Sequence, residues 1–238
     1  MFMALAWSAG MALIVLLSRQ PSLAQRVAGL SGLLKSEFGI LVFPAAMLLL
    51  PKALGWLAFA VFSLRIAFEA VRVWRSSRSQ VLSTLAFIAM PLLPLVAMGA
   101  VFSASETAAT LLLALLYVEV FDSLALLGGT LFGRRLVWPS LSPRKSWEGY
   151  GFGVAGLIGA AALTLLFNMA SPWQVTLTVL CTVVFAPVGD LFASWSKRLA
   201  GAKDYPVLVA GQGGALDIYD AWITVAPVTV LVLHTALG

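Results

Sequence analysis

Eight apolar stretches, each close to the length needed to cross a bilayer, dominate this 238-residue chain and leave it few ways to fold. Hydrophobic residues make up 61% of the sequence and charged residues 11%, whereas soluble domains carry about 25% charged residues. Only a membrane can accommodate so much apolar surface in a chain of this length. We therefore predict an all-α, polytopic integral membrane protein with helices over about 2–18, 36–51, 53–72, 80–101, 107–131, 150–169, 173–196 and 217–237.

Two of these stretches allow other interpretations. The second is short and is separated from the third only by "PKALG", so this pair is also compatible with a re-entrant hairpin. No basic residue precedes the first stretch, as would be typical of a cleaved signal peptide, so we expect it to be a retained helix. We find no internal repeat and predict one membrane domain over 1–238.

The basic residues alternate between loops, which predicts the orientation of the chain in the membrane. Among the loops that separate the predicted spans, the even-numbered ones hold only Lys52, and Arg65 lies within a span. The odd-numbered loops hold Arg19, Arg26, Lys35, Arg72, Arg75, Arg78, Arg134, Arg135, Arg144, Lys145, Lys197, Arg198 and Lys203. We expect both termini to face away from the cytoplasm, and the long polar loops 132–149 and 197–216 to face it.

Carboxylates within membrane spans are costly and are by default functional. Glu119 and Asp122 are three residues apart and share a helix face, as do Asp217 and Asp220 at the start of the last span. Four aspartates lie in the cytoplasmic halves or ends of their helices: Asp122, Asp190, Asp217 and Asp220. We predict that these four converge on one cavity. Arg65 and Glu69, four apart, are expected to form an ion pair.

The type of these side chains limits the chemistry. Oxygen ligands without His or Cys favour Mg²⁺, which binds one or two carboxylates together with substrate phosphates, over zinc. A cation or proton pathway would also use buried acids, and Asp217 alone would serve as a helix cap. Cys181 is the single cysteine, so an intramolecular disulfide is excluded.

Cations and glycines accompany the acids in both long polar loops. "GRRLVWPSLSPRKSWEGYGFG" carries four cations and leads through Gly149, Gly151 and Gly153 into a span, and "GQGG" precedes the last helix. Glycines allow a close backbone approach, and helix N-termini present free N–H groups to phosphate. The set predicts a site for phosphate and Mg²⁺, although each cation alone is also explained as a topology signal.

Three segments resemble the phosphatidate cytidylyltransferases, also called CDP-diacylglycerol synthases. "GDLFASWSKRLAGAKDYPVLVAGQGGALDIYD" is similar to the family's S-x-x-K-R, K-D, P-G-H-G-G and D-R-x-D signature, "LSPRKSWEG" to S-P-K-K-T-W-E-G, and "FDSLALLGGTLFGRR" to D-T-x-A-Y-x-x-G-x-x-x-G-R. The signature residues that match are Ser194, Lys197, Arg198, Lys203, Asp204, Gly211, Gly213, Gly214, Asp217 and Asp220. The resemblance covers about 117–222, so we divide the domain into N-terminal helices, 1–105, and a catalytic part, 106–238.

Three positions depart from the family pattern. Gln212 replaces its His, Ile218 replaces the Arg of D-R-x-D, and Ala193 replaces an acidic residue. Glutamine can still form hydrogen bonds but cannot act as a cation or a general acid. The chain is therefore expected to be a divergent member of the family.

The resemblance implies transfer of the cytidylyl group of CTP to phosphatidate, with Mg²⁺ as cofactor. The roles it implies are catalysis by Lys197, Arg198, Lys203 and Asp204; substrate binding by Ser142, Arg144, Lys145, Ser194, Gly211, Gln212, Gly213 and Gly214; and metal binding by Asp217, Asp220, Asp190 and Asp122.

It also implies a bacterial inner membrane, an active site facing the cytoplasm, membrane lipids as surroundings and no nucleic acid, with a homodimer left open. A CTP-dependent kinase of a polyprenol-type or phytol-type alcohol, an ion-coupled transporter and an inactive paralogue stay as alternatives.

Overall fold

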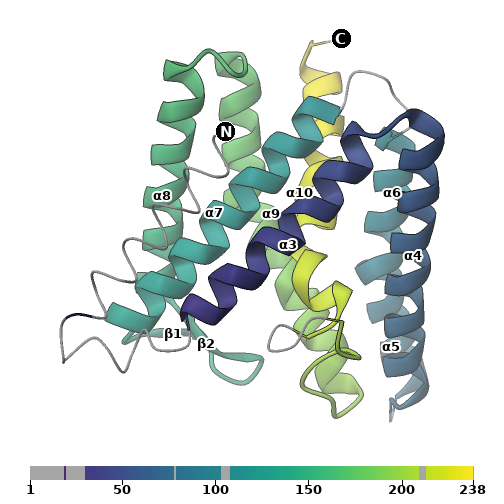
Figure 1. The fold of residues 1–238 in the computed structure, drawn as a ribbon. Coiled ribbons are helices and arrows are strands. Elements are labelled where there is room, and N and C mark those ends of the chain that lie inside the picture. Colours follow the sequence, from purple (N-terminus) through teal and green to yellow (C-terminus); the bar gives the residue numbers. More distant parts are fainter. Residues whose placement is uncertain (1–18, 20–29, 78, 103–107, 209–212, 238) are drawn as a thin grey trace.

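The structure, a computed structural model, describes Arg19 and residues 30–77, 79–102, 108–208 and 213–237, and shows a bundle of long helices with a small hairpin at one end (Figure 1). Within these residues, six helical segments are long and apolar enough to cross a membrane: Lys52–Arg75, Gln80–Phe102, Ala108–Phe132, Trp147–Leu166, Pro172–Leu199 and Ala215–Ala236. They confirm the six predicted spans from 53–72 to 217–237 and the helical fold class.

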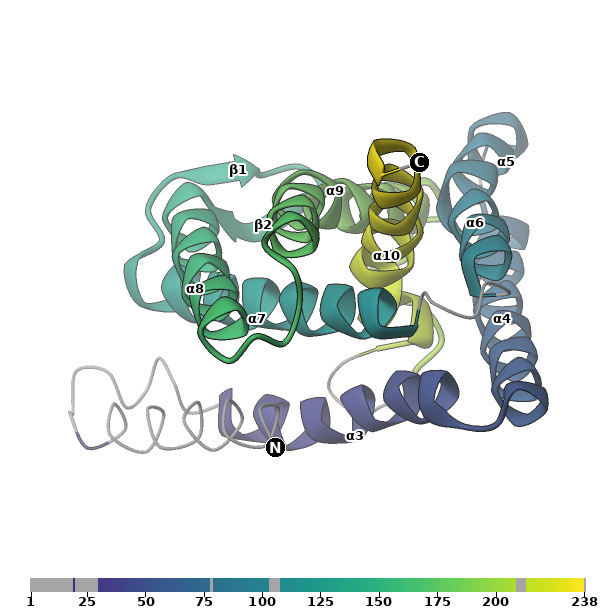
Figure 2. The ribbon, with the colours of Figure 1, turned by 90° about the horizontal axis from the view of Figure 1, so that it is seen from above.

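The two predicted spans nearest the N-terminus are not confirmed as spans. The run 36–51 falls largely in helix α3 (Leu30–Leu49), whose described apolar part, Ile40–Leu49, is shorter than a membrane crossing. Helix α3 lies beside α7 when the bundle is seen from above (Figure 2). The run 2–18 lies outside the described residues, so the predicted number of eight spans stays a prediction.

The remaining helices follow the apolar runs closely. They are α4 (Lys52–Arg75), α5 (Gln80–Phe87), the π-helical turn η1 (Ile88–Leu92), α6 (Leu93–Phe102), α7 (Ala108–Phe132), α8 (Trp147–Leu166), α9 (Pro172–Leu199) and α10 (Ala215–Leu237). Ser146 and Ser171 are the N-caps of α8 and α9, and their hydroxyls accept the amides of Gly149 and Gln174. Such caps satisfy donors that the first helical turn leaves free.

One predicted span, 80–101, is a helix with an interruption. Segments α5, η1 and α6 follow one another without a loop, and Met90 has non-helical backbone angles (φ −152°, ψ 114°) directly before Pro91. Because proline lacks an amide hydrogen, it cannot continue the regular hydrogen-bond pattern of the helix.

Helix α10 is the centre of the bundle, between α9, α7 and α6 (Figure 2). In its membrane-length window 67% of the residues are buried inside the protein, against 28% to 39% for the other five spans. Two of its buried polar side chains are paired with neighbouring helices: the Trp222 indole donates to the Leu111 carbonyl (3.2 Å), and the Tyr219 hydroxyl to that of Ile40 (2.8 Å). Residues of the last predicted span are therefore fixed from several sides.

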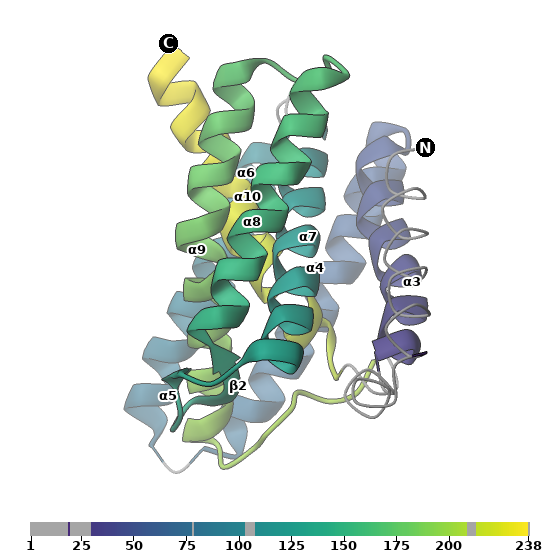
Figure 3. The same ribbon diagram turned by 90° about the vertical axis from the view of Figure 1, so that its left-hand side faces the viewer.

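Three of the loops that the sequence predicts to be cytoplasmic lie, in their described residues, at one end of the bundle (Figures 1 and 3). The α4–α5 connection, the segment from 133 to 146 and the segment that follows α9 are at this end, and the α3–α4 and α8–α9 connections are at the other. The segment 133–146 forms an antiparallel hairpin of β1 (Leu136–Trp138) and β2 (Ser142–Ser146), which the sequence analysis did not predict.

Candidate active site

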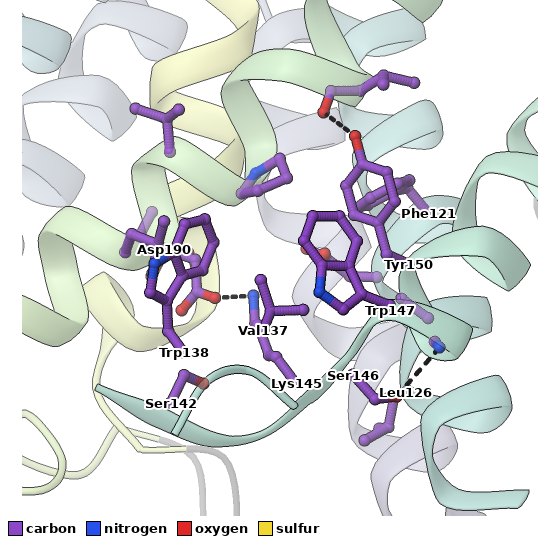
Figure 4. Close-up of a pocket in the computed structure, with 18 of the residues that line it drawn as sticks. Phe121, Leu126, Val137, Trp138, Ser142, Lys145, Ser146, Trp147, Tyr150 and Asp190 are labelled. Atoms are coloured by element: carbon purple, nitrogen blue, oxygen red, sulfur yellow. Dashed lines mark hydrogen bonds and ion pairs between the residues drawn. The ribbon is translucent and has the colours of Figure 1, made fainter. Parts of the chain in front are cut away.

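A cavity of about 550 Å³ lies between α7, α8, α9, α10 and the hairpin, at the basic end of the bundle (Figure 4). Its walls are mostly apolar and aromatic, and Trp138 and Trp147 lie on either side of Lys145. The charged and hydroxyl-bearing side chains of its lining, tyrosine aside, are Asp122, Ser142, Lys145, Ser146, Asp190, Asp217 and Asp220. Pockets of this kind, apolar with a few convergent polar groups, are typical of ligand sites.

The four aspartates that the sequence analysis singled out all line this cavity, as predicted. Asp122 comes from α7, Asp190 from α9, and Asp217 and Asp220 from the first turns of α10. They are not clustered tightly, since the described residues contain no group of three or more His, Cys, Asp or Glu side chains that could hold a metal ion. The cavity thus gathers the acids without forming a complete protein cage.

Gly189 makes the close approach of two of these helices possible. A Cβ atom at this position would lie 2.7 Å from the carbonyl oxygen of Asp220 and 2.6 Å from the Thr224 hydroxyl. Because a real Cβ does not come so close to backbone, a larger residue would push α9 away from α10. This glycine directly precedes Asp190, so it helps to bring Asp190 and Asp220 into the same cavity.

Asp190 is paired with the hairpin. Its Oδ2 atom forms an ion pair with the Lys145 ammonium of β2, across the cavity (Figure 4). The lysine side chain is 40% exposed and that of Asp190 23%, so the pair is open to a ligand. A polyanionic ligand would compete with Asp190 for Lys145.

Asp217 is held almost entirely by the protein. Its Oδ1 atom is paired with the Lys197 ammonium, and both side chains are nearly buried (8% and 9% exposed). Its Oδ2 atom accepts the backbone amides of Tyr205 (2.8 Å) and Gly214 (2.9 Å). The alternative of a capping role for Asp217 is therefore confirmed in this structure, since it takes the amide that precedes α10.

Asp220 and Asp122 have fewer protein partners. Asp220 is 5% exposed, and among the described residues its Oδ1 atom accepts only the amide of the next residue, Ala221 (2.6 Å). Asp122 is exposed in the cavity lining, and its carboxylate is attracted electrostatically by Lys145. The Asp220 carboxyl interacts electrostatically with Lys197, Lys145 and Asp122. This pair of acids keeps the most capacity for a further cation.

Tyr205 supports the Lys197–Asp217 pair from below. Its backbone amide donates to Asp217. Its ring forms a cation–π contact with Lys197, with 5.3 Å between the ammonium nitrogen and the ring centroid. The side chain is 1% exposed, and burial raises the pKa of its hydroxyl above the usual value, so the group stays protonated.

Tyr150 of α8 and Val183 of α9 form a hydrogen bond between two walls of the cavity, at a carbonyl that Pro187 leaves free. A proline within a helix leaves the carbonyl four residues earlier without its donor, and for Pro187 that carbonyl belongs to Val183. The Tyr150 hydroxyl of α8 donates to this oxygen at 2.9 Å (Figure 4). Neither Tyr150 nor Pro187 was identified from the sequence, although a proline within a predicted span was a usable signal.

Two of the glycines that lead into α8 pack against α7, and their role in ligand approach stays a prediction. A Cβ at Gly149 would lie 2.6 Å from the Ala125 carbonyl, and one at Gly153 would lie 2.8 Å from that of Phe121. These positions let α8 lie directly on α7, as small residues do in membrane helix pairs. A Cβ at Gly151, on another face, would meet nothing within 4 Å among the described residues.

The turn before α10 contains two of the predicted phosphate-binding glycines. Gly213 has φ +95°, a conformation that favours glycine, and the Gly214 amide donates to Asp217. In this structure the Gly214 amide is therefore used within the protein, and the binding of phosphate by Gly213 and Gly214 stays a prediction. Gly211 and Gln212 lie outside the described residues, as does the side chain of Arg144.

The other predicted residues are more dispersed. Ser142 lines the cavity and Ser194 is buried in α9. Arg198, Lys203 and Asp204 are exposed outside the cavity lining, and Arg198 donates to the Ala202 carbonyl (3.2 Å). Among the positions that depart from the family pattern, Ile218 lines the cavity and Ala193 is buried.

Arg65 and Glu69 form the predicted ion pair, with 2.6 Å between Nε and Oε1. The pair also reaches the turn before α10, which the sequence analysis missed. The Glu69 carboxylate accepts the amides of Ala215 and Leu216, both at 2.8 Å. Spacing within α4 predicted the ion pair, but a contact 146 residues away has no local sequence signal.

Comparisons with known proteins agree with these features. The chain is 36% identical over 141 residues to a protein of Thermotoga maritima named phosphatidate cytidylyltransferase, an alignment that covers 55% of this chain and 51% of the relative. Proteins with the same name from Staphylococcus saprophyticus and Haemophilus influenzae are 34% and 36% identical, over 54% and 48% of this chain and 50% and 43% of theirs. The alignments thus span about half the length of these curated relatives.

The family comparison extends further along the chain. The model described as "Cytidylyltransferase family" matches residues 2–236, and so includes the N-terminal helices as well as the helices that line the cavity. On this match, the chain belongs to the cytidylyltransferase family.

Proposed function

We propose that this protein transfers the cytidylyl group of CTP to phosphatidate, forming CDP-diacylglycerol and pyrophosphate. The observation that carries the proposal is the cavity, which combines apolar walls with four aspartates and Lys145 at the basic end of a membrane bundle. One substrate is a lipid and the other a water-soluble polyanion, so a site at the end of the bundle can be reached by both. The names of the relatives support the same reaction.

The reaction follows from the charges of the two substrates. A phosphate oxygen of phosphatidate attacks the α-phosphorus of CTP, a new P–O–P linkage forms, and the bond from the α-phosphorus to the oxygen shared with the β-phosphorus breaks. Pyrophosphate leaves with that oxygen. Because the attacking group is already an anion at neutral pH, no strong base is required, and catalysis consists of aligning the anions and neutralising their charge.

Lys145 and Lys197 are the cations placed for this task. Lys145 reaches into the cavity from the hairpin, and its pair with Asp190 is open enough for a phosphate to replace the carboxylate. Lys197 is held by Asp217 and Tyr205 at the edge of the same site. In this assignment Lys145 binds the nucleotide triphosphate, while Lys197 provides a fixed positive charge for the group that becomes pyrophosphate.

The residues of the cavity fit Mg²⁺. Apart from Lys145, the charged side chains of its lining are all carboxylates. Mg²⁺ needs only one or two carboxylates beside phosphate and water oxygens. Asp220 and Asp122 would hold the ion, because Asp217 and Asp190 are already engaged in direct ion pairs with Lys197 and Lys145. When bound, the ion supplies charge neutralisation for the triphosphate.

We also place the cavity on the cytoplasmic side of a bacterial inner membrane, where CTP is found. Its support is the concentration of basic loops at the cavity end of the bundle. A cysteine introduced at Lys203 should resist an impermeant thiol reagent in intact cells and react after lysis. Labelling in intact cells would reverse the orientation.

The activity test uses the purified protein with phosphatidate, Mg²⁺ and CTP labelled either at the α or at the γ phosphate. The proposal expects label from α-labelled CTP in the lipid fraction and label from γ-labelled CTP in pyrophosphate. Transfer of the γ label to a polyprenol or phytol-type alcohol would instead identify a kinase. Absence of both transfers in a folded sample would overturn the proposal.

A further inference from the structure

Helix α4, which lies outside the segments that resemble the family signature, contacts the site through two charged side chains. Glu69 is completely buried (0% exposed), and Arg65 is its ion-pair partner one turn earlier. A buried charge is stable only if it is paired and hydrogen-bonded. The hydrogen-bond partners of Glu69 and Arg65 therefore indicate which part of the protein the pair stabilises.

Glu69 serves as a cap for a helix to which it does not belong. Its Oε1 and Oε2 atoms accept the amides of Ala215 and Leu216, the first two residues of α10. These are donors that the helix itself leaves unsatisfied, and a carboxylate at this end is also favoured by the helix dipole. The contact requires glycine before the helix, since a Cβ at Gly214 would lie 2.5 Å from Oε2.

Arg65 holds the other end of the same segment. Its Nη2 atom donates to the carbonyl oxygens of Pro206 (2.8 Å) and Val207 (3.3 Å), while its Nε atom binds Glu69. The two side chains thus attach residues 206–207 and residues 215–216 to the same helix, α4. We call Arg65 and Glu69 the α4 clamp.

The clamp is connected to the reactive groups by one further step. Gly214, where a Cβ would meet the Glu69 carboxylate, donates its amide to Asp217, and Asp217 pairs with Lys197. Tyr205, beside the Arg65 contact at Pro206, donates its amide to the same carboxylate. A shift of this turn would move Asp217 and Lys197 together, and with them the start of α10 that carries Asp220.

We propose that Arg65 and Glu69 are positioning residues that set the place of Lys197 and of the α10 aspartates for the reaction. This inference rests on the proposed function for its kinetic consequences, but the clamp itself has a structural readout. It assigns the N-terminal helices a part in catalysis beyond crossing the membrane.

The experiment compares Glu69→Gln and the milder Arg65→Lys with Arg72→Gln, a change of an exposed arginine on the same helix. Glutamine at position 69 keeps one acceptor oxygen but turns its NH₂ group toward one of the α10 amides. Lysine at position 65 keeps the positive charge but lacks the separate guanidinium N–H groups that bind Glu69 and the 206–207 carbonyls. Hydrogen exchange is followed in peptides over 205–220 and, as an internal reference, over α7 and α8. Turnover is measured with α-labelled CTP.

The proposal expects faster exchange confined to 205–220 in both clamp variants, and a fall in kcat of about 100-fold for Glu69→Gln, as for misplacement of reacting groups by about 1 Å. Arg72→Gln should match the wild type in both. Unchanged kcat, or faster exchange throughout the protein, would overturn the positioning role. If the wild-type protein transferred no cytidylyl group, the proposed function would fail, while exchange confined to 205–220 would still support the clamp.

Discussion

The carboxylates around the start of α10 fall into two groups that differ in how many protein partners they have. Glu69 on α4 and Asp217 at the edge of the cavity accept amides and pair with cations, so that both oxygens of each carboxylate have protein partners. Deeper in the cavity lining, Asp220 accepts one amide from its own neighbour, and Asp122 is exposed and, among the described residues, has only the electrostatic attraction of Lys145. In sequence these acids look equivalent. Their partners show that Glu69 and Asp217 are fastening carboxylates, which hold parts of the protein together, whereas Asp220 and Asp122 are available carboxylates, which can still bind a ligand.

Removal of an available carboxylate should affect the reaction most. We expect Asp220→Asn to lower cytidylyl transfer by about 1000-fold, which corresponds to about 4 kcal/mol of the charge stabilisation that a metal site provides. The melting temperature should stay the same or rise, because the lost charge is buried with few partners. Rates measured over a Mg²⁺ titration test this, and a near-normal rate at every concentration would contradict it.

Removal of a fastening carboxylate should affect stability as well. In Asp217→Asn the nearly buried Lys197 ammonium loses its partner, and breaking a buried pair from one side costs about 3 to 5 kcal/mol. We expect a clear fall in melting temperature together with the loss of turnover. Asp204→Asn, an exposed change nearby, is the stability control and should leave the melting temperature unchanged. Equal melting temperatures for both variants would remove the distinction.

The cavity wall offers a comparison between two glycines of α8. Gly149→Ala would push a methyl group against the Ala125 backbone, and such overpacking typically costs about 1 to 3 kcal/mol. Gly151→Ala meets nothing within 4 Å and should be neutral or slightly stabilising, because alanine is the better helix former. Thermal unfolding in detergent measures both. The reverse order would mean that α7 and α8 are not packed through Gly149.

The smallest expected effect concerns the Tyr150 hydroxyl, which donates a hydrogen bond to the Val183 carbonyl in the cavity wall. Tyr150→Phe leaves the Val183 carbonyl without its donor, at a cost of about 1 kcal/mol. In a Pro187→Ala background the helix can supply that donor itself, so the same change should cost clearly less. A double-mutant cycle on the unfolding free energy gives the answer, and additive changes would show that the two residues act independently.

The spans were predictable because the membrane imposes a length and a composition that can be read locally. Convergence of Asp122, Asp190, Asp217 and Asp220 was predictable for the same reason, since charge alternation places their helix ends on one side. The Glu69 contact with Ala215 was not, because it joins residues 146 positions apart. Nor was the packing role of Gly149 and Gly153, since a glycine that approaches a ligand and one that approaches a helix look alike in sequence.

The central place of α10 has a consequence for how freely this chain can change. A helix face against lipid needs only to be apolar, so one aliphatic residue replaces another there at little cost. Helix α10, 67% buried, must instead fit protein on nearly every side while it carries Asp217 and Asp220. Substitutions should therefore accumulate in α8 and in the outer faces of α4 and α5, and α10 should be the last helix whose sequence drifts.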